Sequence, residues 1–248
     1  MYRVDLNSDI GEGMAFDEEI IRHISSANIA CGFHAGNDLI IRNTISLCGD
    51  GNVGIGAHPG FDDRENFGRR RIILSNYELS KLITVQLRKI SQISEEFGLK
   101  MTHVKPHGAL YNMACEEKRI ADSISNAVAS FDSNLILVGL PNSELINSAY
   151  KKGLSVANEV FADRAYTENG KLLSRNLSGS VIEDEEYVTS RTLEMIKENR
   201  VKTITGKYID IKADTVCVHG DTRNAVNLIV KIREALLKNG VEIKKLYE

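Results

Sequence analysis

Short runs of β-branched and other apolar residues alternate along the chain with longer stretches whose apolar positions recur every three or four residues. The short runs are typical of buried strands, and the longer stretches have the period of amphipathic helices. The predicted strands cover residues 3–8, 27–31, 53–57, 101–105, 134–138, 155–160 and 215–218. The clearest predicted helices cover residues 38–47, 77–97, 117–131, 143–152, 184–198 and 223–238. Seven strand-then-helix units indicate an α/β protein with a parallel sheet, either closed into a barrel or doubly wound.

The stretch 77–97 shows the clearest helix boundaries. Ser75 with Glu78 has the spacing of a capping box, and Gly98 is the residue type that commonly ends a helix. Residues 164–180, in contrast, have no clear period and contain two glycines. We expect a long excursion from the sheet there, and such loops often act as lids over functional sites.

Length and composition agree with a single β/α barrel domain over residues 1–248. Hydrophobic residues make up 42% of the 248 residues and charged residues 26%, which lies in the usual globular range. Only three prolines occur, so a Pro-rich linker or a disordered chain is excluded.

The charge pattern narrows the expected partners and compartment. The chain has 31 basic and 34 acidic side chains, a net charge of −3, and its longest basic run is the three arginines at 69–71, so we expect no nucleic-acid partner. No apolar run approaches the roughly 20 residues that cross a bilayer, and no signal-peptide pattern is visible near the start. The four cysteines stand singly, without CxxC spacing. We therefore expect a cytoplasmic protein without a membrane partner.

Polar residues gather where the predicted strands end. Because the carboxyl ends of parallel strands share one face, which is where ligands bind in such folds, these residues predict an active site. The set comprises Asp9, His34, His58, His103, Lys105, His107, Glu159, Asp163, Arg164, His219 and Asp221.

The first strand carries an unusual polar row. Asp5, Asn7 and Asp9 occupy alternate positions and therefore project to the same side. If that side is the barrel interior, the two carboxylates repel and the pKa of one rises, which suits general acid or base catalysis. The alternative for Asp5 is a structural pair with an interior lysine or arginine.

The densest polar cluster is the segment 103–112, His-Val-Lys-Pro-His-Gly-Ala-Leu-Tyr-Asn. His103 and Lys105 share a face by the period of two, and Pro106 fixes the turn that carries His107 past the strand. A lysine there could hold a carboxylate or phosphate, or stabilise an oxyanion. The alternative for His103 is a histidine satisfied within the core.

Two further kinds of site are possible on residue type alone. Asp9, His34 and His58 could form an Asp-His-His set for a divalent metal, although local metal spacing such as HExxH is absent and a dyad without metal explains the same residues. Cys31 near the mouth is either a nucleophile or a buried thiol, and the burial reading is favoured.

Seven segments resemble one known family, the LamB/YcsF family of 5-oxoprolinase A subunits. They are DLNSDIGE (5–12), NIACGFHAG (28–36), GAHPG (56–60), FGRR (67–70), HVKPHGALYN (103–112), EVFADRAY (159–166) and CVHGD (217–221). They follow in order between residue 3 and about residue 240. Ser8 stands where the family usually has cysteine, so this position is not a nucleophile, and the segment 62–66 is more charged than usual.

The resemblance implies a seven-stranded β/α barrel of the glycoside hydrolase/deacetylase type. It further implies ATP-dependent opening of 5-oxoproline to glutamate together with partner subunits B and C. The sequence has no GxxxxGK[ST] motif, which suits a division of labour in which the partners handle ATP.

On this resemblance we assign the expected roles. Asp9 or a nearby carboxylate activates water, Lys105 and Arg164 hold the carboxylate or phosphate, and His58 or His107 handles the proton at the ring nitrogen. We expect the residues that bind substrate to be Asn7, His34, His103, Arg164, His219 and Asp221.

Two other functions fit the same residues. The first is a metal-dependent carbohydrate or amide deacetylase, with Asp9 and His58 among the ligands of one divalent ion. The second is a non-catalytic protein that binds a lactam or sugar for a partner. The clustering of titratable groups favours chemistry over binding alone.

Overall fold

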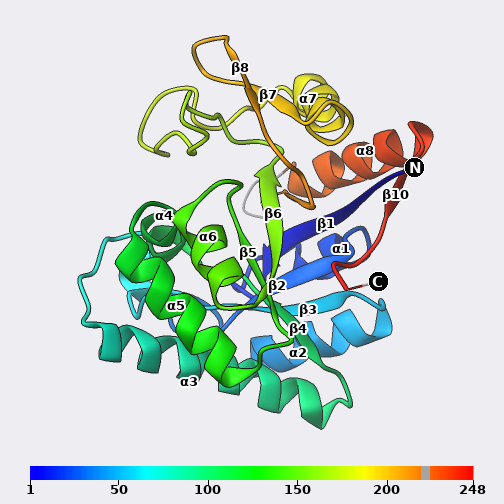
Figure 1. The fold of residues 1–248 in the computed structure, drawn as a ribbon. Helices are drawn as coiled ribbons and strands as arrows, with labels where there is room; N and C mark the ends of the chain where they lie inside the picture. Colours follow the sequence, from blue (N-terminus) through cyan, green and yellow to red (C-terminus); the bar gives the residue numbers. More distant parts are fainter. Residues whose placement is uncertain (219–223, 248) are drawn as a thin grey trace.

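The structure, a computed structural model, describes residues 1–218 and 224–247. Seven parallel strands form a closed ring in the order β1-β2-β3-β4-β5-β6-β9, and β9 pairs back with β1 (Figure 1). The strands are β1 (Tyr2–Ile10), β2 (Ser26–Ala30), β3 (Gly54–His58), β4 (Met101–Val104), β5 (Ile136–Gly139), β6 (Ser155–Phe161) and β9 (Thr215–Cys217). Each overlaps one predicted strand. The seven-stranded parallel β/α barrel is therefore confirmed, and the doubly wound alternative is wrong.

Helices surround the barrel. They are α1 (Asp17–Ile21), α2 (Asp38–Asp50), α3 (Asn76–Glu96), α4 (Gly108–Glu116), α5 (Lys118–Phe131), α6 (Glu144–Lys151), α7 (Glu185–Lys197) and α8 (Ala225–Lys238), with a 3-10 turn η1 (Arg64–Asn66). The six predicted helices are confirmed to within a few residues at their ends. In α3 the capping box is present, because Ser75 Oγ accepts from the Glu78 N–H and the Glu78 carboxylate accepts from the Ser75 N–H.

Five of the α-helices and strands in the described residues have no counterpart among the predicted ones. They are α1, α4, the short strands β7 (Arg200–Lys202) and β8 (Tyr208–Asp210), and β10 (Val241–Ile243). Helix α4 has buried side chains on most of its sides, so its sequence lacks the stripe of an amphipathic helix. β7 and β8 form an antiparallel hairpin outside the barrel, and β10 pairs with the start of β1.

Residues 164–180 leave the barrel after β6, as predicted. The segment folds back on itself through a bridge between Tyr166 and Leu172. It also contacts the β7–β8 hairpin, since the Ile204 N–H donates to the Tyr166 carbonyl, and the two lie together in Figure 1. Its role as a lid stays a prediction.

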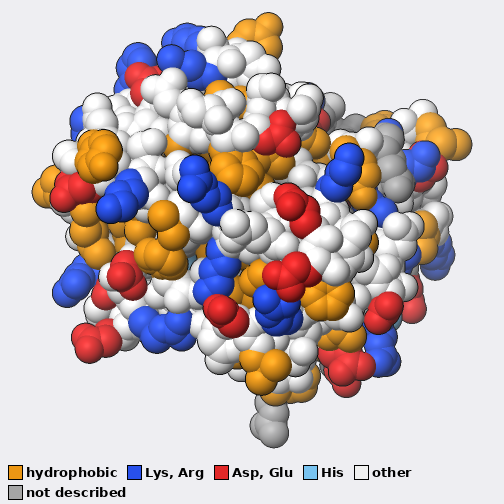
Figure 2. All heavy atoms as spheres, turned by 90° about the horizontal axis from the view of Figure 1, so that it is seen from below, with side chains coloured by type: hydrophobic (Ala, Val, Ile, Leu, Met, Phe, Trp, Pro, Cys, Tyr) orange, Lys and Arg blue, Asp and Glu red, His pale blue; other side chains and the backbone are white. Residues whose placement is uncertain are grey.

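The apolar content of the helices and the distribution of surface charge concern the expected absence of membrane and nucleic-acid partners. No helix in residues 1–218 and 224–247 is long and apolar enough to cross a bilayer. On the face shown in Figure 2, acidic and basic side chains are interspersed among hydrophobic ones. That face therefore carries no extended field of one sign.

A layer of buried polar side chains fills the barrel interior beneath the strand ends. Asn7 donates to Thr215 (2.6 Å) and accepts from Asn28 (2.8 Å), and His103 Nε2 lies 3.1 Å from Asn28 Oδ1. The His103 ring packs so closely on β3 that a Cβ at Gly56 would lie 2.1 Å from its Nε2. Only glycine at position 56 therefore leaves room for this network.

Asp5 belongs to the same layer and is 2% exposed. Its carboxylate accepts from the hydroxyls of Thr215 (2.5 Å) and Ser25 (2.7 Å). These contacts agree with the structural alternative for Asp5, with hydroxyl groups as partners in place of a lysine or arginine. Burial raises the pKa of Asp5 to about 6.

This raised pKa predicts how Asp5→Asn changes stability with pH. Between the usual carboxyl pKa of 3.8 and the raised value, Asp5 keeps its proton in the folded state but loses it in the unfolded state. The contribution of Asp5 to the free energy of unfolding of the wild type therefore falls as pH rises from about 4 to about 7. A shift of about two units corresponds to about 3 kcal/mol. The free energy of unfolding of Asp5→Asn relative to wild type is expected to rise by up to that amount over the interval. Urea titrations of both proteins across this pH range measure it, and a constant difference contradicts the raised pKa.

Candidate functional site

A cavity of about 370 Å³ opens where the barrel strands end. Its floor is made by Asp9 at the end of β1, His58 at the end of β3, and Lys105 and His107 just after β4. Residues 171–176 of the excursion form part of its wall. Five of the eleven strand-end positions singled out in the sequence therefore line one cavity, as expected where parallel strands end: Asp9, His58, Lys105, His107 and Arg164.

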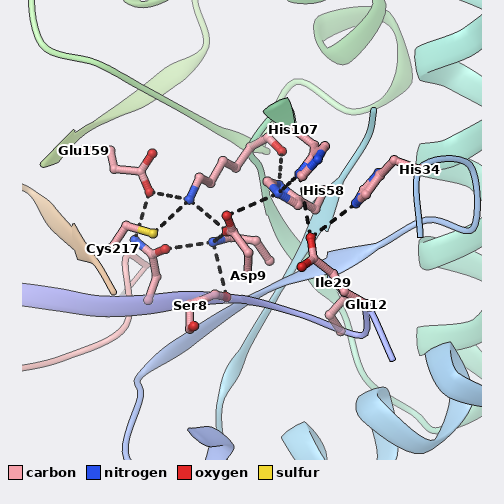
Figure 3. A network of polar contacts seen from close by, with 12 residues as sticks. Ser8, Asp9, Glu12, Ile29, His34, His58, His107, Glu159 and Cys217 are labelled. Atoms are coloured by element: carbon pink, nitrogen blue, oxygen red, sulfur yellow. Dashed lines mark hydrogen bonds and ion pairs between the residues drawn. The ribbon is translucent and has the colours of Figure 1, made fainter. Parts of the chain in front are cut away.

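Lys105 is the electrostatic centre of the floor and is 2% exposed. Its ammonium lies 2.8 Å from Asp9 Oδ1 and 2.8 Å from Glu159 Oε1, and it donates to Cys217 Sγ at 3.2 Å (Figure 3). Burial by itself would lower the pKa of Lys105, but the two carboxylates more than offset this and hold the pKa well above its usual value. Lys105 is therefore charged and fixes the orientation of Asp9.

The neighbouring histidines have ring orientations set by backbone carbonyls. His58 Nδ1 lies 2.7 Å from the Lys105 carbonyl, and His107 Nε2 lies 2.9 Å from the Phe67 carbonyl. Because a carbonyl only accepts, these two nitrogens carry the protons of the neutral rings. The other nitrogens, His58 Nε2 and His107 Nδ1, then carry lone pairs, yet they face each other at 2.9 Å. Asp9 Oδ2, another acceptor, lies 3.3 Å from His58 Nε2.

Glu12 and His34 complete a cluster around these lone pairs, which we call the histidine–glutamate cluster: Glu12, His34, His58 and His107. Glu12 Oε1 lies 3.4 Å from His34 Nε2 and 3.7 Å from His107 Nδ1. One ligand atom from each residue lies within 4.8 Å of the other three. The His34 ring is fully buried, and neither of its nitrogens has a hydrogen-bond partner among the described residues.

A cation is the group that satisfies such a set of converging acceptors. Burial, together with the neighbouring His58 and His34, lowers the pKa of His107 well below its usual value, and burial lowers that of His34 to about 2. A proton is therefore held poorly here. Imidazole nitrogens with one carboxylate are a common ligand set for divalent metals, and the cluster fits one.

This cluster differs in composition from the Asp-His-His set considered from the sequence. His34 and His58 belong to both, whereas Asp9 lies beside the cluster, ion-paired to Lys105. Glu12 was not singled out by the sequence reasoning. It sits between Gly11 and Gly13, both with positive φ, in the turn after β1. This turn brings Glu12 over the barrel mouth, and only its position three residues after Asp9 could have signalled it.

The other predicted residues occupy different places. Asn7 and His103 do not line the cavity; they belong to the buried layer beneath it, where Asn7 donates to Glu159 (3.2 Å). Burial and the nearby Lys105 lower the pKa of His103 to about 3. His219 and Asp221 lie outside the described residues.

Arg164, predicted to bind substrate, and Cys31, predicted as either a nucleophile or a buried thiol, have different surroundings. Arg164 lines the cavity but donates to the carbonyls of Leu173 (2.6 Å) and Ser180 (3.1 Å), so it braces the excursion. Cys31 is fully buried, and burial raises the pKa of its thiol to about 12. This agrees with the buried-thiol reading of Cys31.

Comparison with known proteins identifies close relatives. The LamB/YcsF family model matches residues 4–248. The chain is 47% identical over 248 residues to the A subunit of 5-oxoprolinase from Campylobacter jejuni, covering 98% of this chain and 97% of the relative. It is 41% identical to the lactam utilization protein from Thermus thermophilus, whose crystal structure superimposes with a TM-score of 0.92 over 98% of this chain and 99% of that one. A peptidoglycan deacetylase from Bacillus subtilis (13% identity, TM-score 0.51, 98% and 87% coverage) shares the fold alone.

Proposed function

Because the chain belongs to the LamB/YcsF family, we propose that it is the A component of a cytoplasmic, ATP-hydrolysing 5-oxoprolinase. The complete enzyme opens the ring of 5-oxo-L-proline to give L-glutamate and includes partner subunits B and C. The relatives are named as the A subunit of 5-oxoprolinase and as a lactam utilization protein, and these names support both the lactam substrate and the multi-subunit assembly.

One observation carries the proposal. A single cavity is lined by a carboxylate held in place by a buried lysine and by three members of the histidine–glutamate cluster, Glu12, His58 and His107. Asp9 faces both, since its Oδ1 lies 2.8 Å from Lys105 and its Oδ2 lies 3.3 Å from His58. A preorganised base beside a site for a cation suits the addition of water to an amide carbon.

The cavity residues divide the work as follows. Asp9 takes the proton of the attacking water, and Lys105 keeps Asp9 ionised and oriented. The four residues of the histidine–glutamate cluster would hold a divalent ion, which would supply Lewis-acid stabilisation of negative charge at the reacting oxygen. His58 and His107 have only their inward nitrogens available, so metal ligation replaces the proton transfer that the sequence led us to expect of them.

ATP enters because a γ-lactam is a stable amide. Transfer of the γ-phosphoryl group of ATP to the amide oxygen releases ADP and makes the ring carbon more electrophilic. Water then adds to this carbon, the bond between the carbon and the ring nitrogen breaks as the nitrogen takes a proton, and the acyl phosphate that results is hydrolysed by a second water to L-glutamate and phosphate. The chain has no Walker motif, so we assign the ATP site to the partner subunits.

Glutamate release from 5-oxoproline with ATP tests this function. We expect turnover when the chain is mixed with subunits B and C, and none from the chain alone. Asp9→Asn is expected to lower turnover of the mixture by about 100-fold or more, because a positioned base contributes that much. The matched control is Asp50→Asn, an exposed carboxylate at the end of α2, which is expected to keep full turnover.

Other results would contradict the proposal. Full turnover by the Asp9→Asn mixture would remove Asp9 from its role. An inactive mixture that instead releases acetate from an N-acetylated sugar would favour the deacetylase alternative. Binding of 5-oxoproline without turnover in any mixture would favour the non-catalytic binding protein.

A further inference from the structure

A buried glutamine on the apolar face of α3 holds the segment that follows β3. Gln86 is fully buried, on the same face of the helix as Ile83 and Ile90. Its Oε1 accepts from the Gly60 N–H (3.0 Å), and its Nε2 donates to the Gly60 carbonyl (2.9 Å) and to the Leu82 carbonyl of its own helix (3.1 Å). Gln86 therefore pairs with both backbone groups of Gly60, as a neighbouring strand would.

Gly60 lies in turn against the ring of His34. A Cβ at position 60 would lie 2.6 Å from His34 Nδ1, so only glycine fits beside this ring. The His34 ring is also stacked on the ring of His107, with the centroids 3.7 Å apart and the planes inclined by 3°. Because His34 is fully buried between these contacts, a displacement of Gly60 would displace its ring or leave a gap beside it.

The same short segment also sets the positions of the other two histidines of the cluster. His58 stands two residues before Gly60. The carbonyl of Pro59, between them, accepts from the His107 N–H (2.9 Å). The backbone of residues 58–60 therefore carries one histidine, borders the ring of the second and anchors the backbone of the third.

We propose that Gln86 is a positioning residue of the histidine–glutamate cluster. By holding Gly60, it fixes the separations of the ring nitrogens of His34, His58 and His107 before an ion binds. Ligands that are already in place bind an ion more tightly, because less conformational freedom is lost on binding. This inference rests on the proposed function for the ion itself. An apolar side chain of similar length would fill the same space in α3, whereas the amide also holds the segment that bears the ligands.

Gln86→Met tests this role, because it removes the amide and keeps the length of the side chain. We expect it to weaken the affinity of the purified chain for a divalent ion by about 10- to 100-fold, as the loss of a residue that orients metal ligands does. Competition with a chelator, with Zn²⁺ and Mn²⁺ as the probes, measures this affinity well below the unfolding temperature. Gln92→Met is the matched control, since Gln92 is exposed on the same helix and is expected to leave the affinity unchanged.

Nitrogen NMR of the histidine rings in the metal-free protein gives a readout that does not depend on the ion. Gln86→Met is expected to shift the ring resonances of His34 and His58 and to leave those of His23, outside the cluster, unchanged. Gly60→Ala is expected to shift the same resonances and to weaken metal affinity, because its Cβ would press on the His34 ring.

The outcomes separate the positioning role from the metal site. Lower metal affinity with shifted ring resonances in Gln86→Met supports the inference. Wild-type affinity in the folded variant overturns it and leaves the proposed function intact, and lower affinity with unshifted resonances overturns it as well. If Gln86→Met does not fold, wild-type affinity in Gly60→Ala overturns the inference. A wild type that binds neither ion contradicts the metal site of the proposed function, and the ring resonances of the metal-free variants then decide the positioning role by themselves.

Discussion

Lys105→Met is expected to abolish turnover and to lower the free energy of unfolding by about 3–5 kcal/mol at neutral pH. Methionine matches the length of lysine but leaves Asp9 and Glu159 facing one another without the cation that lies 2.8 Å from each. Glu159 is fully buried, so water cannot take over the role of the ammonium. Urea unfolding and glutamate release measure the two losses.

The pH dependence of the Lys105→Met deficit identifies its cause. Without Lys105, one carboxyl of the pair retains a proton in the folded state, so its folded pKa rises above the unfolded value. The loss of stability relative to wild type is then expected to grow as pH rises from the unfolded pKa of this carboxyl to its folded pKa. Below about pH 5 the loss is expected to shrink. Glu159→Gln added to Lys105→Met is expected to restore part of the stability but not the turnover. Lys100→Met, at an exposed position before β4, is the matched control, and a Lys105→Met protein as stable as wild type at pH 8 would contradict the argument.

Most of the barrel could be predicted because its strands and helices are locally encoded. The strand segments are short apolar runs, and α3 carries its own start signal in Ser75 and Glu78. The elements that were missed depend on tertiary surroundings. Helix α4 is buried on most sides and so has no polar face to set a period, and β10 gains its strand character from pairing with β1.

The functional site also has some features that the local sequence predicts and others that depend on tertiary contacts. The rule that parallel strands end on one face placed Asp9, His58, Lys105 and His107 together without knowledge of any contact. The pairing of Lys105 with Glu159 crosses the barrel interior and depends on its register, which local pattern does not encode. Glu12 and the lone-pair geometry of the histidines depend on a glycine turn and on two backbone carbonyls, neither of which has a sequence signature.

The histidine–glutamate cluster predicts that the purified chain binds one divalent ion. His107→Ala is expected to weaken metal affinity by more than about 100-fold, because the loss of a second-shell partner alone costs 10- to 100-fold and His107 offers a ligand atom directly. Elemental analysis of the protein and competition with a chelator measure this affinity. Turnover of the complex is expected to fall with metal content and to return when the ion is restored.

His23→Gln supplies the matched control, since His23 lies outside the cavity lining and the cluster. A metal-free wild type that is fully active and insensitive to chelators would contradict metal ligation. The facing nitrogens of His58 and His107 would then have to share a proton, because two acceptors 2.9 Å apart require a cation between them. In that case His107→Ala would abolish turnover without changing the metal content of the protein. His58 and His107 would then transfer the proton at the ring nitrogen, as the sequence predicted, and would not bind a metal. Metal content and turnover measured on the same variant therefore decide between the two cations that this geometry allows.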